Sequence, residues 1–326
     1  MDVWNRKCST HLFLLHEVIM KPRHFFVLIV LFGAACLYGQ QSVNVDQAGM
    51  NNEIIIEQLG QNNQADVIQR VNNSTSQVEQ TGSNNEVYQL NSANSSGYIN
   101  DQYITQTGNN NRAVQMGLNG TGYGVQQITQ TGFNNYASQL RRGDASSAYI
   151  TQLGTRNEAE EKIFAASDHA KATIIQDGND NTDRIHIEGS QALSGHDKAI
   201  IETHGNDNGR LIDAVSINLV GDNHTARIYQ GLEGDVNSNQ ASINLVGNFS
   251  NAATGSNATI TQEYGNNNSA RINSVGISNG TSTENGLEIV QHGSNNLGEL
   301  NVFGVGLEGS IIQLGNNMTV RVTRTN

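Results

Sequence analysis

The chain has 326 residues, with 18 Lys and Arg against 30 Asp and Glu, and its one Pro, one Trp and two Cys all lie within the first 36 residues. Residues 41–326 therefore carry no thiol, which excludes a disulfide framework, a cysteine nucleophile and a thiolate metal site from that part. The acidic excess argues against a nucleic-acid partner, because phosphate binding needs clustered Lys and Arg.

The first predicted element is an export signal. Lys21 and Arg23 precede an unbroken apolar run over residues 25–32, and small residues follow at 33–35. This order is typical of a secretory signal peptide. We predict that residues 1–40 form an N-terminal extension and a signal peptide that starts at Met20 and is cleaved near Gly39. An uncleaved anchor helix, or a lipoprotein cleaved before Cys36, remains an alternative.

The rest of the chain is a repeat. Residues 41–326 hold 43 Asn and 24 Gln, a composition that fits either disorder or stacked β-structure with amide ladders. The segment Gln58-Leu59-Gly60-Gln61-Asn62-Asn63 returns as Gln106-Thr107-Gly108-Asn109-Asn110-Asn111, and 13 such copies occur at spacings of 11 to 28 residues. An aliphatic residue stands four before the glycine in 12 of them, which argues against disorder.

Each copy contributes a turn, an amide position and an aliphatic position. The turn glycines are Gly49, Gly60, Gly82, Gly108, Gly132, Gly154, Gly178, Gly205, Gly221, Gly247, Gly265, Gly293 and Gly315. The predicted ladder amides are Gln47, Gln58, Gln80, Gln106, Gln130, Gln152, Gln176, Gln291 and Gln313, with Asn52, Asn63, Asn85, Asn111, Asn135, Asn157, Asn181, Asn208, Asn268 and Asn296. The predicted aliphatic positions are Val45, Ile56, Val78, Ile104, Ile128, Ile150, Ile174, Ile201, Ile217, Ile243, Ile289 and Ile311.

The spacing of these positions indicates a strand, a turn and a second strand. Ile104 and Gln106 are two residues apart, so they share one face of a strand, and Asn111 and Ala113 share one face after the turn. Stacking such units about 4.8 Å apart places like residues on one another, so each buried amide can bond to its neighbours above and below. We predict an all-β repeat β-solenoid over residues 41–326.

Rung size follows from the first copies. Gly49, Gly60, Val71 and Gly82 fall at steps of 11 residues, which predicts a rung of two strands, with about one rung per later copy. Later copies carry insertions, which we expect to form loops at one end of the rungs. These span residues 91–97, 117–124, 141–147, 189–197, 231–239, 273–285 and 302–308.

The repeat resembles the curlin repeat of bacterial curli subunits, Gln-x-Gly-x-x-Asn-x-Ala-x-x-x-Gln. Gln58, Gly60, Asn63, Ala65 and Gln69 match every fixed position, and most other copies match in part. The resemblance implies a secreted structural subunit that leaves through an outer-membrane pore and assembles into extracellular amyloid fibres for adhesion and biofilm. The implied partners are further copies of the chain, other curlin-like subunits, the secretion pore and host or abiotic surfaces.

The alternative is a soluble β-helix, either a surface adhesin or a glycan-active enzyme, which would need charged groups clustered on one exposed face. The run Glu158, Glu160 and Glu161 is better interpreted as solvated. No nucleophile elbow, phosphate loop or zinc-binding motif appears. We therefore expect no catalytic, metal or cofactor site.

Overall fold

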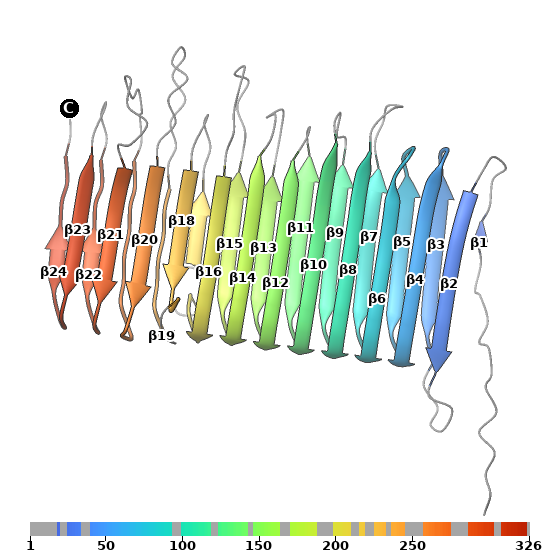
Figure 1. The fold of residues 1–326 in the computed structure, drawn as a ribbon, viewed down its shortest axis with the longest axis horizontal. Coiled ribbons are helices and arrows are strands. Elements are labelled where there is room, and N and C mark those ends of the chain that lie inside the picture. Colours follow the sequence, from blue (N-terminus) through green and yellow to red (C-terminus); the bar gives the residue numbers. More distant parts are fainter. Residues whose placement is uncertain are drawn as a thin grey trace, which may run out of the picture.

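The computed structural model describes residues 18–19, 25–33, 40–92, 99–118, 123–142, 146–163, 170–187, 198–209, 215–218, 225–232, 236–244, 257–274, 286–302 and 308–324. In these ranges every regular element is a β-strand, and the strand pairs are parallel. The chain winds into two stacked sheets, so the prediction of an all-β solenoid is confirmed (Figure 1).

Strands alternate between the two sheets along the chain. Sheet A contains β1 (Val18–Ile19), β3 (Ser42–Ala48), β5 (Gln64–Arg70), β7 (Glu86–Ser92), β9 (Arg112–Leu118), β11 (Tyr136–Arg142), β13 (Glu158–Ile163), β15 (Thr182–Ile187) and β17 (Val215–Asn218). Sheet B contains β2 (Phe25–Gly33), β4 (Asn52–Gln61), β6 (Thr75–Ser83), β8 (Asn100–Asn109), β10 (Gly124–Phe133), β12 (Ser147–Thr155), β14 (Lys171–Asn179), β16 (Lys198–Asn206), β18 (Thr225–Gln230), β20 (Asn257–Glu263), β21 (Gly286–His292) and β23 (Gly309–Leu314).

The line of sheet A continues towards the C-terminus in a less regular form. Single bridges join Ser216 to Ser242 and Ser269 to Leu297, which is the first residue of β22 (Leu297–Glu299). The last strand, β24 (Thr319–Arg321), pairs with β22. In sheet B, the short β19 (Val236–Asn237) pairs with the end of β16.

The alternation of side chains along each strand builds the core between the sheets. In β8, Gln102, Ile104 and Gln106 are buried, whereas Tyr103 and Thr105 face outward and are half-buried. A single strand cannot bury its inner face, so the facing sheet and the neighbouring rungs supply the contacts. The inward positions stack in register along the solenoid, as the pairing of β8 with β10 illustrates.

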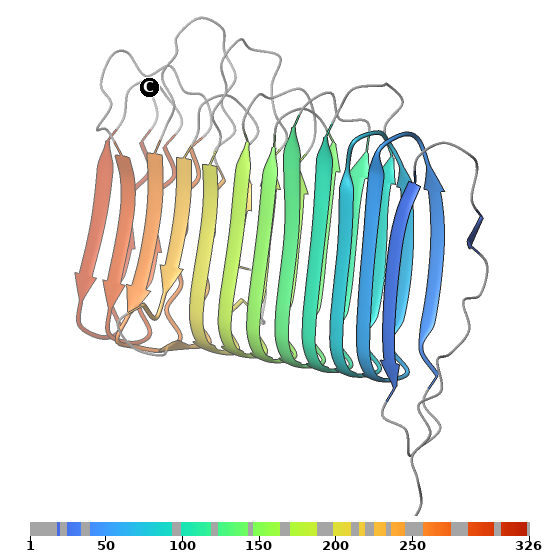
Figure 2. The same cartoon turned by 45° about the vertical axis from the view of Figure 1, so that its right-hand side comes forward.

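The two edges of the solenoid differ. From β4 to β15, short arcs join each strand of sheet B to the next strand of sheet A and line one edge (Figure 2). Four of the predicted insertions, residues 91–97, 117–124, 141–147 and 189–197, connect a strand of sheet A to the next strand of sheet B. Residues 273–285 and 302–308 connect the less regular continuation of sheet A to β21 and β23, and most residues of these six insertions lie outside the described ranges. Residues 231–239 instead follow β18 on the arc side, so the expectation that all insertions share one end is wrong there.

The segment predicted as a signal peptide contributes two strands. β2 pairs with β4 in the register that sets Gly33 opposite Gly60, and β1 pairs with β3. The remainder of residues 1–39 lies outside the described ranges. Among the described residues there is no helix with the length and apolar character that crossing a membrane requires.

Candidate functional site

The turn from sheet B to sheet A explains the repeated glycine. Gly60 has φ 123° and Asn62 has φ 54°, and the same pair of positive values returns at Gly108 and Asn110. A Cβ on Gly60 would lie 1.8 Å from the carbonyl oxygen of Gly82 on the next rung. Only glycine therefore allows successive arcs to stack this closely.

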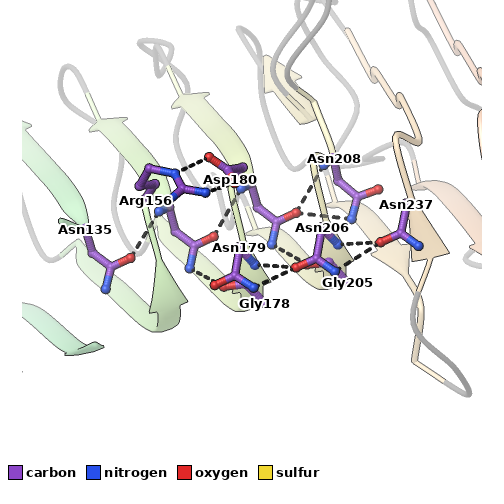
Figure 3. Close-up of polar contacts among 11 residues, drawn as sticks. Asn135, Arg156, Gly178, Asn179, Asp180, Gly205, Asn206, Asn208 and Asn237 are labelled. Atoms are coloured by element: carbon purple, nitrogen blue, oxygen red, sulfur yellow. Dashed lines mark hydrogen bonds and ion pairs between the residues drawn. The ribbon is translucent and has the colours of Figure 1, made fainter. Parts of the chain in front are cut away.

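The buried asparagine after each arc ties that arc to its neighbours. Asn157 Nδ2 donates to the Gly178 carbonyl at 2.8 Å, and its Oδ1 accepts from the backbone N–H of Asn181 at 3.1 Å. Figure 3 shows this column beside a second one on the outside of the arc, where the Asn179 N–H donates to Asn206 Oδ1 at 2.9 Å. The asparagines therefore satisfy the backbone groups that the turn leaves unpaired.

A glutamine ladder runs through the interior of sheet B with one polarity. Gln58 Nε2 donates to Gln80 Oε1 at 2.6 Å, and each following glutamine donates to the next as far as Gln176. The ladder resumes from Gln230 and ends at Gln313. The second amide hydrogen usually bonds to a backbone carbonyl of sheet A, as Gln80 does with Gln64. Acceptors thus face the N-terminus and donors face the C-terminus.

This polarity leaves an unpaired acceptor at each ladder's beginning. The buried Oε1 atoms of Gln47, Gln58, Gln89, Gln102 and Gln230 have no hydrogen-bond donor among the described residues. Gln89, Gln102 and Gln230 begin their ladders inside the solenoid. The residue at the same position of the preceding rung is Val67, Ser76 and Thr203, respectively. Gln47 and Gln58 instead belong to the first strands after the predicted signal peptide.

The last glutamine of the main ladder presents donors. Gln313 Nε2 donates to the carbonyl oxygens of Leu297 and Met318, both at 3.0 Å. Met318 O takes the place that the next glutamine Oε1 occupies on earlier rungs. The ladder therefore ends with a donor at the C-terminal rung and an unpaired acceptor at the N-terminal rung, two groups that complement each other.

A second glutamine ladder lies inside sheet A and ends in a carboxyl group. Gln89 donates to Gln115, Gln115 to Gln139, and Gln139 to Glu161 Oε2 at 2.9 Å. Glu161 is buried, so the interpretation of this residue as solvated is wrong. Burial raises the pKa of the Glu161 carboxyl well above its usual range, and the hydrogen bond from Gln139 offsets only part of that effect.

Another buried carboxyl lies where the main ladder is interrupted. Asp183 replaces the small residue of its column, next to Ala159, and Thr203 replaces the glutamine of the facing strand. Burial raises the pKa of Asp183 well above its usual range, and hydrogen bonds from Thr203 and Gln176 lower it in part. The carboxyl groups of Glu161 and Asp183 are thus both enclosed in the middle rungs.

Most of the sequence-predicted amides and aliphatic residues lie in the columns just described. Gln58, Gln80, Gln106, Gln130, Gln152, Gln176, Gln291 and Gln313 share the sheet B ladder, beside Ile56, Val78, Ile104, Ile128, Ile150, Ile174, Ile201, Ile289 and Ile311. Asn63, Asn85, Asn111, Asn135, Asn157, Asn181, Asn208, Asn268 and Asn296 share the asparagine column at the arcs.

Three copies belong to the other sheet, which corrects the assumption of one rung per copy. Val45, Gln47 and Gly49 lie on or just after β3 in sheet A, and Asn52 lies on the opposite edge from the asparagine column. Ile217 pairs with Ile185 in sheet A, and Ile243 bonds to Ser216 beside it. Gly221 and Gly247 lie outside the described residues. The motif occurs on both half-rungs, because both must turn and bury an aliphatic side chain.

Sequence reasoning missed several ladder members. Gln230 and Gln262 belong to the main ladder, with Ile228 and Ile260 in the aliphatic column. Tyr264 is an extra residue before Gly265, so the glycine-based count selected Thr261 instead of Ile260. The ladder through Gln89, Gln115 and Gln139 has a signal in the sequence, since each follows the column asparagine by four residues.

Among the described residues, no group of three or more His, Cys, Asp and Glu side chains is arranged to hold a metal ion. Several ion pairs on the surface join neighbouring rungs, as Arg156 does with Asp180 at 2.6 Å. The repeated chemistry of the interior is hydrogen bonding between stacked amides, which holds rungs together.

Comparison with known families agrees with the motif. Residues 49–82 match the family model described as the curlin associated repeat. This family is structural and non-enzymatic. No curated protein matches the chain. The resemblance read from the sequence is thereby confirmed for this stretch.

Proposed function

We propose that this chain, which carries the curlin-associated repeat, is a secreted subunit of curli-type extracellular fibres that grows by stacking end rungs. The fibres serve cell adhesion and a biofilm matrix. The repeat family supports an extracellular structural role. The partners we propose are further copies, other curlin-like subunits, an outer-membrane secretion pore and host or abiotic surfaces.

One observation carries the proposal: the main glutamine ladder is open at its N-terminal end. Gln58 Oε1 is buried with no donor among the residues that the structure describes, and a buried unpaired acceptor costs about 1–3 kcal/mol. Gln313 Nε2 of a second subunit is the matching donor. When β23 of one subunit pairs with β4 of the next, Gln313 meets Gln58 and Gly315 meets Gly60, as consecutive rungs do within the chain.

The predicted signal peptide holds this position in the full chain. β2 pairs with β4 so that Leu31, a residue type without an amide, stands opposite Gln58. Cleavage near Gly39 removes β2 and frees the backbone edge of β4. An exposed parallel edge in register with another subunit's last strand is a template for addition of that strand. We therefore propose that export and readiness for assembly are coupled.

Sheet A adds a requirement at the junction. β3 already lies at the level where an incoming β24 would sit, because β3 pairs with β5 as β2 pairs with β4. The three-residue β24 therefore leaves β22, and β3 takes its place. Loss of β24 frees Gln313 Nε2 from Met318 O, so the same rearrangement supplies the donor for Gln58.

The test compares the chain beginning at Gln40 with the full chain at neutral pH. We expect the shorter chain to form fibres that bind amyloid dyes and give a reflection near 4.8 Å along the fibre axis. Gln313→Leu should slow seeded elongation about tenfold, because it removes the donor and leaves Gln58 unpaired. The matched control is Ser310→Ala on the outer face of β23. A shorter chain that stays monomeric, or equal elongation rates for the two variants, would contradict the proposal.

A further inference from the structure

The outer face of sheet A carries an apolar strip that the fibre junction does not use. Ile68, Leu90, Met116 and Leu140 stand in one outward column on β5, β7, β9 and β11. All four are half-buried, although they point away from the core. The corresponding column of sheet B carries Glu79, Thr105, Thr129 and Thr151. An outward column of four large apolar side chains is thus peculiar to sheet A in these rungs.

The charges around the strip are arranged with opposite signs at its two ends. In the same column, Asp46 precedes Ile68 and Lys162 follows Leu140. One column away Tyr88 stands beside Val114, and at the beginning of these strands Glu86 stands beside Arg112 at 3.5 Å. If a second copy faces this surface with its strands in the reverse order, these acidic side chains meet basic ones and these apolar side chains meet apolar ones.

We propose that this face binds the same face of a second copy, related by a twofold axis parallel to the strands. Such an axis keeps each column on itself and reverses the strand order, so β7 faces β9 and β5 faces β11. Leu90 then meets Met116 of the second copy, Ile68 meets Leu140, and Asp46 meets Lys162. Glu86 meets Arg112. Arg70 and Arg142 also face each other at the exposed rim, which is the like-charge contact of this arrangement, and Arg70 is ion-paired there with Asp46 of its own chain.

The other twofold arrangement is disfavoured by the same charges. An axis parallel to the solenoid sets each strand opposite its own copy, which also brings the strip onto itself. It places Asp46 on Asp46 and Lys162 on Lys162, and like charges directly opposite are destabilising. The same axis sets Asp66 opposite Arg70, but it separates Glu86 from Arg112 of the second copy. The balance of charged contacts therefore favours the strand-reversing arrangement.

The size of the face fits reversible pairing. Six strands from β3 to β13 at about 4.8 Å, with four outward residues each, cover roughly 600 Å² per copy. The total of roughly 1,200 Å² is at the lower end of specific interfaces. Two fibres that present this face once per subunit would be held together through many such contacts. The pairing itself does not depend on fibre growth.

Cross-linking tests the arrangement in the full chain, with Cys8→Ser and Cys36→Ser. Facing sheets lie about 10 Å apart, so a short bis-maleimide should join Ile68→Cys of one chain to Leu140→Cys of another. Ile68→Cys alone should yield little product, since the two sites are displaced by three strand spacings, about 14 Å. Stacking end to end leaves these sites several rungs apart, so fibre growth does not produce the product.

Charge on the strip supplies the second measurement. Leu90→Lys with Met116→Lys should lower the yield of the mixed product, the cross-link between Ile68→Cys of one chain and Leu140→Cys of another, at least about tenfold. The reason is that the two substitutions bury paired like charges. The matched control, Thr105→Lys with Thr129→Lys, places the same charges on adjacent strands of sheet B and should leave the yield unchanged. Self-linking of Ile68→Cys would overturn the arrangement. No mixed product, or equal loss in both double-lysine variants, would overturn the interface.

Discussion

Thr203 donates its hydroxyl hydrogen to Asp183 Oδ1 at 3.3 Å across the space between the sheets. On the neighbouring rungs a glutamine occupies the position of Thr203, and a small or branched apolar residue occupies that of Asp183. The two exceptions therefore occur together. Thr203 is shorter than the glutamine that it replaces, and the Asp183 side chain fills the space that this leaves. The hydrogen bond between Thr203 and Asp183 takes the place of the glutamine–glutamine bond at this rung.

This pairing predicts a non-additive stability change. Thr203→Gln alone overpacks against Asp183, and Asp183→Ala alone leaves a cavity, so each should lower the free energy of unfolding by about 1–3 kcal/mol. Together they rebuild the ladder, because Gln176 gains an acceptor and Gln230 Oε1 gains its missing donor. Urea unfolding should show the double variant at least as stable as the parent chain. Simple addition of the two losses would contradict the pairing.

The buried carboxyls predict that the fold loses stability as pH rises. The raised pKa of Glu161 means that the folded chain keeps a proton that the unfolded chain releases near pH 4. Stability is therefore highest below about pH 4 and falls as the pH rises towards the folded-state pKa.

Replacing Glu161 with glutamine removes the part of this dependence that comes from Glu161. Glu161→Gln should raise the free energy of unfolding at pH 7 by about 1–3 kcal/mol and flatten its pH profile. Glu160→Gln is the matched control, because Glu160 points outward to Lys162 and Arg184. Chemical unfolding between pH 4 and pH 8 checks both variants. A stabilising effect of equal size at every pH would show that the carboxyl is ionised throughout.

A single ladder glutamine should matter far more than its outward neighbour. Gln106→Ala removes one of the two acceptors of Gln80 Nε2 and leaves Gln130 Oε1 without its donor in the interior, so we expect a loss of about 2–4 kcal/mol. Thr107→Ala should change stability by less than about 0.5 kcal/mol, because Thr107 is exposed. Equal effects in urea unfolding would place the amides outside the core.

Glycines at the stacked arcs should not tolerate alanine, whereas a strand glycine with open space around it should. Gly132 has φ 126°, and a Cβ there would lie 1.9 Å from Gly154 O, so Gly132→Ala should cost about 3 kcal/mol or more. Gly286 is the first residue of β21, and a Cβ there would lie 3.8 Å from the nearest atom, Asn257 O, so Gly286→Ala should be near neutral. Thermal unfolding of the two variants measures the difference.

Periodicity predicted the architecture because one spacing rule governs every rung. Ile104, Gln106 and Asn111 could be assigned to one inner surface from their separations alone, since strand geometry fixes which residues share a face. The motif does not state which sheet a copy belongs to. Val45 and Ile217 consequently lie in sheet A, because both half-rungs bury an aliphatic residue before a turn.

The same spacing rule could not predict local insertions and substitutions. Tyr264 adds one residue between ladder and glycine, which shifts the count at Gly265. Glu161 and Asp183 occupy inward positions by alternation, but the charge of Glu161 suggested solvent. The polarity of the ladder, which leaves Gln58 open and Gln313 as a donor, depends on amide orientation and has no signature in the sequence.

Disulfide formation between Leu59→Cys and Leu314→Cys tests the proposed junction most directly. These exposed residues, at 50 % and 68 % accessibility, lie at opposite ends of one chain but become partners on adjacent strands when β23 pairs with β4. Paired parallel strands lie about 4.8 Å apart, within the range of a disulfide. Oxidation of the double variant beginning at Gln40 should give a series of covalent multimers, while Leu59→Cys with Leu153→Cys should not. If the Leu59→Cys, Leu314→Cys variant forms fibres but gives no covalent multimers on oxidation, end-rung stacking is contradicted.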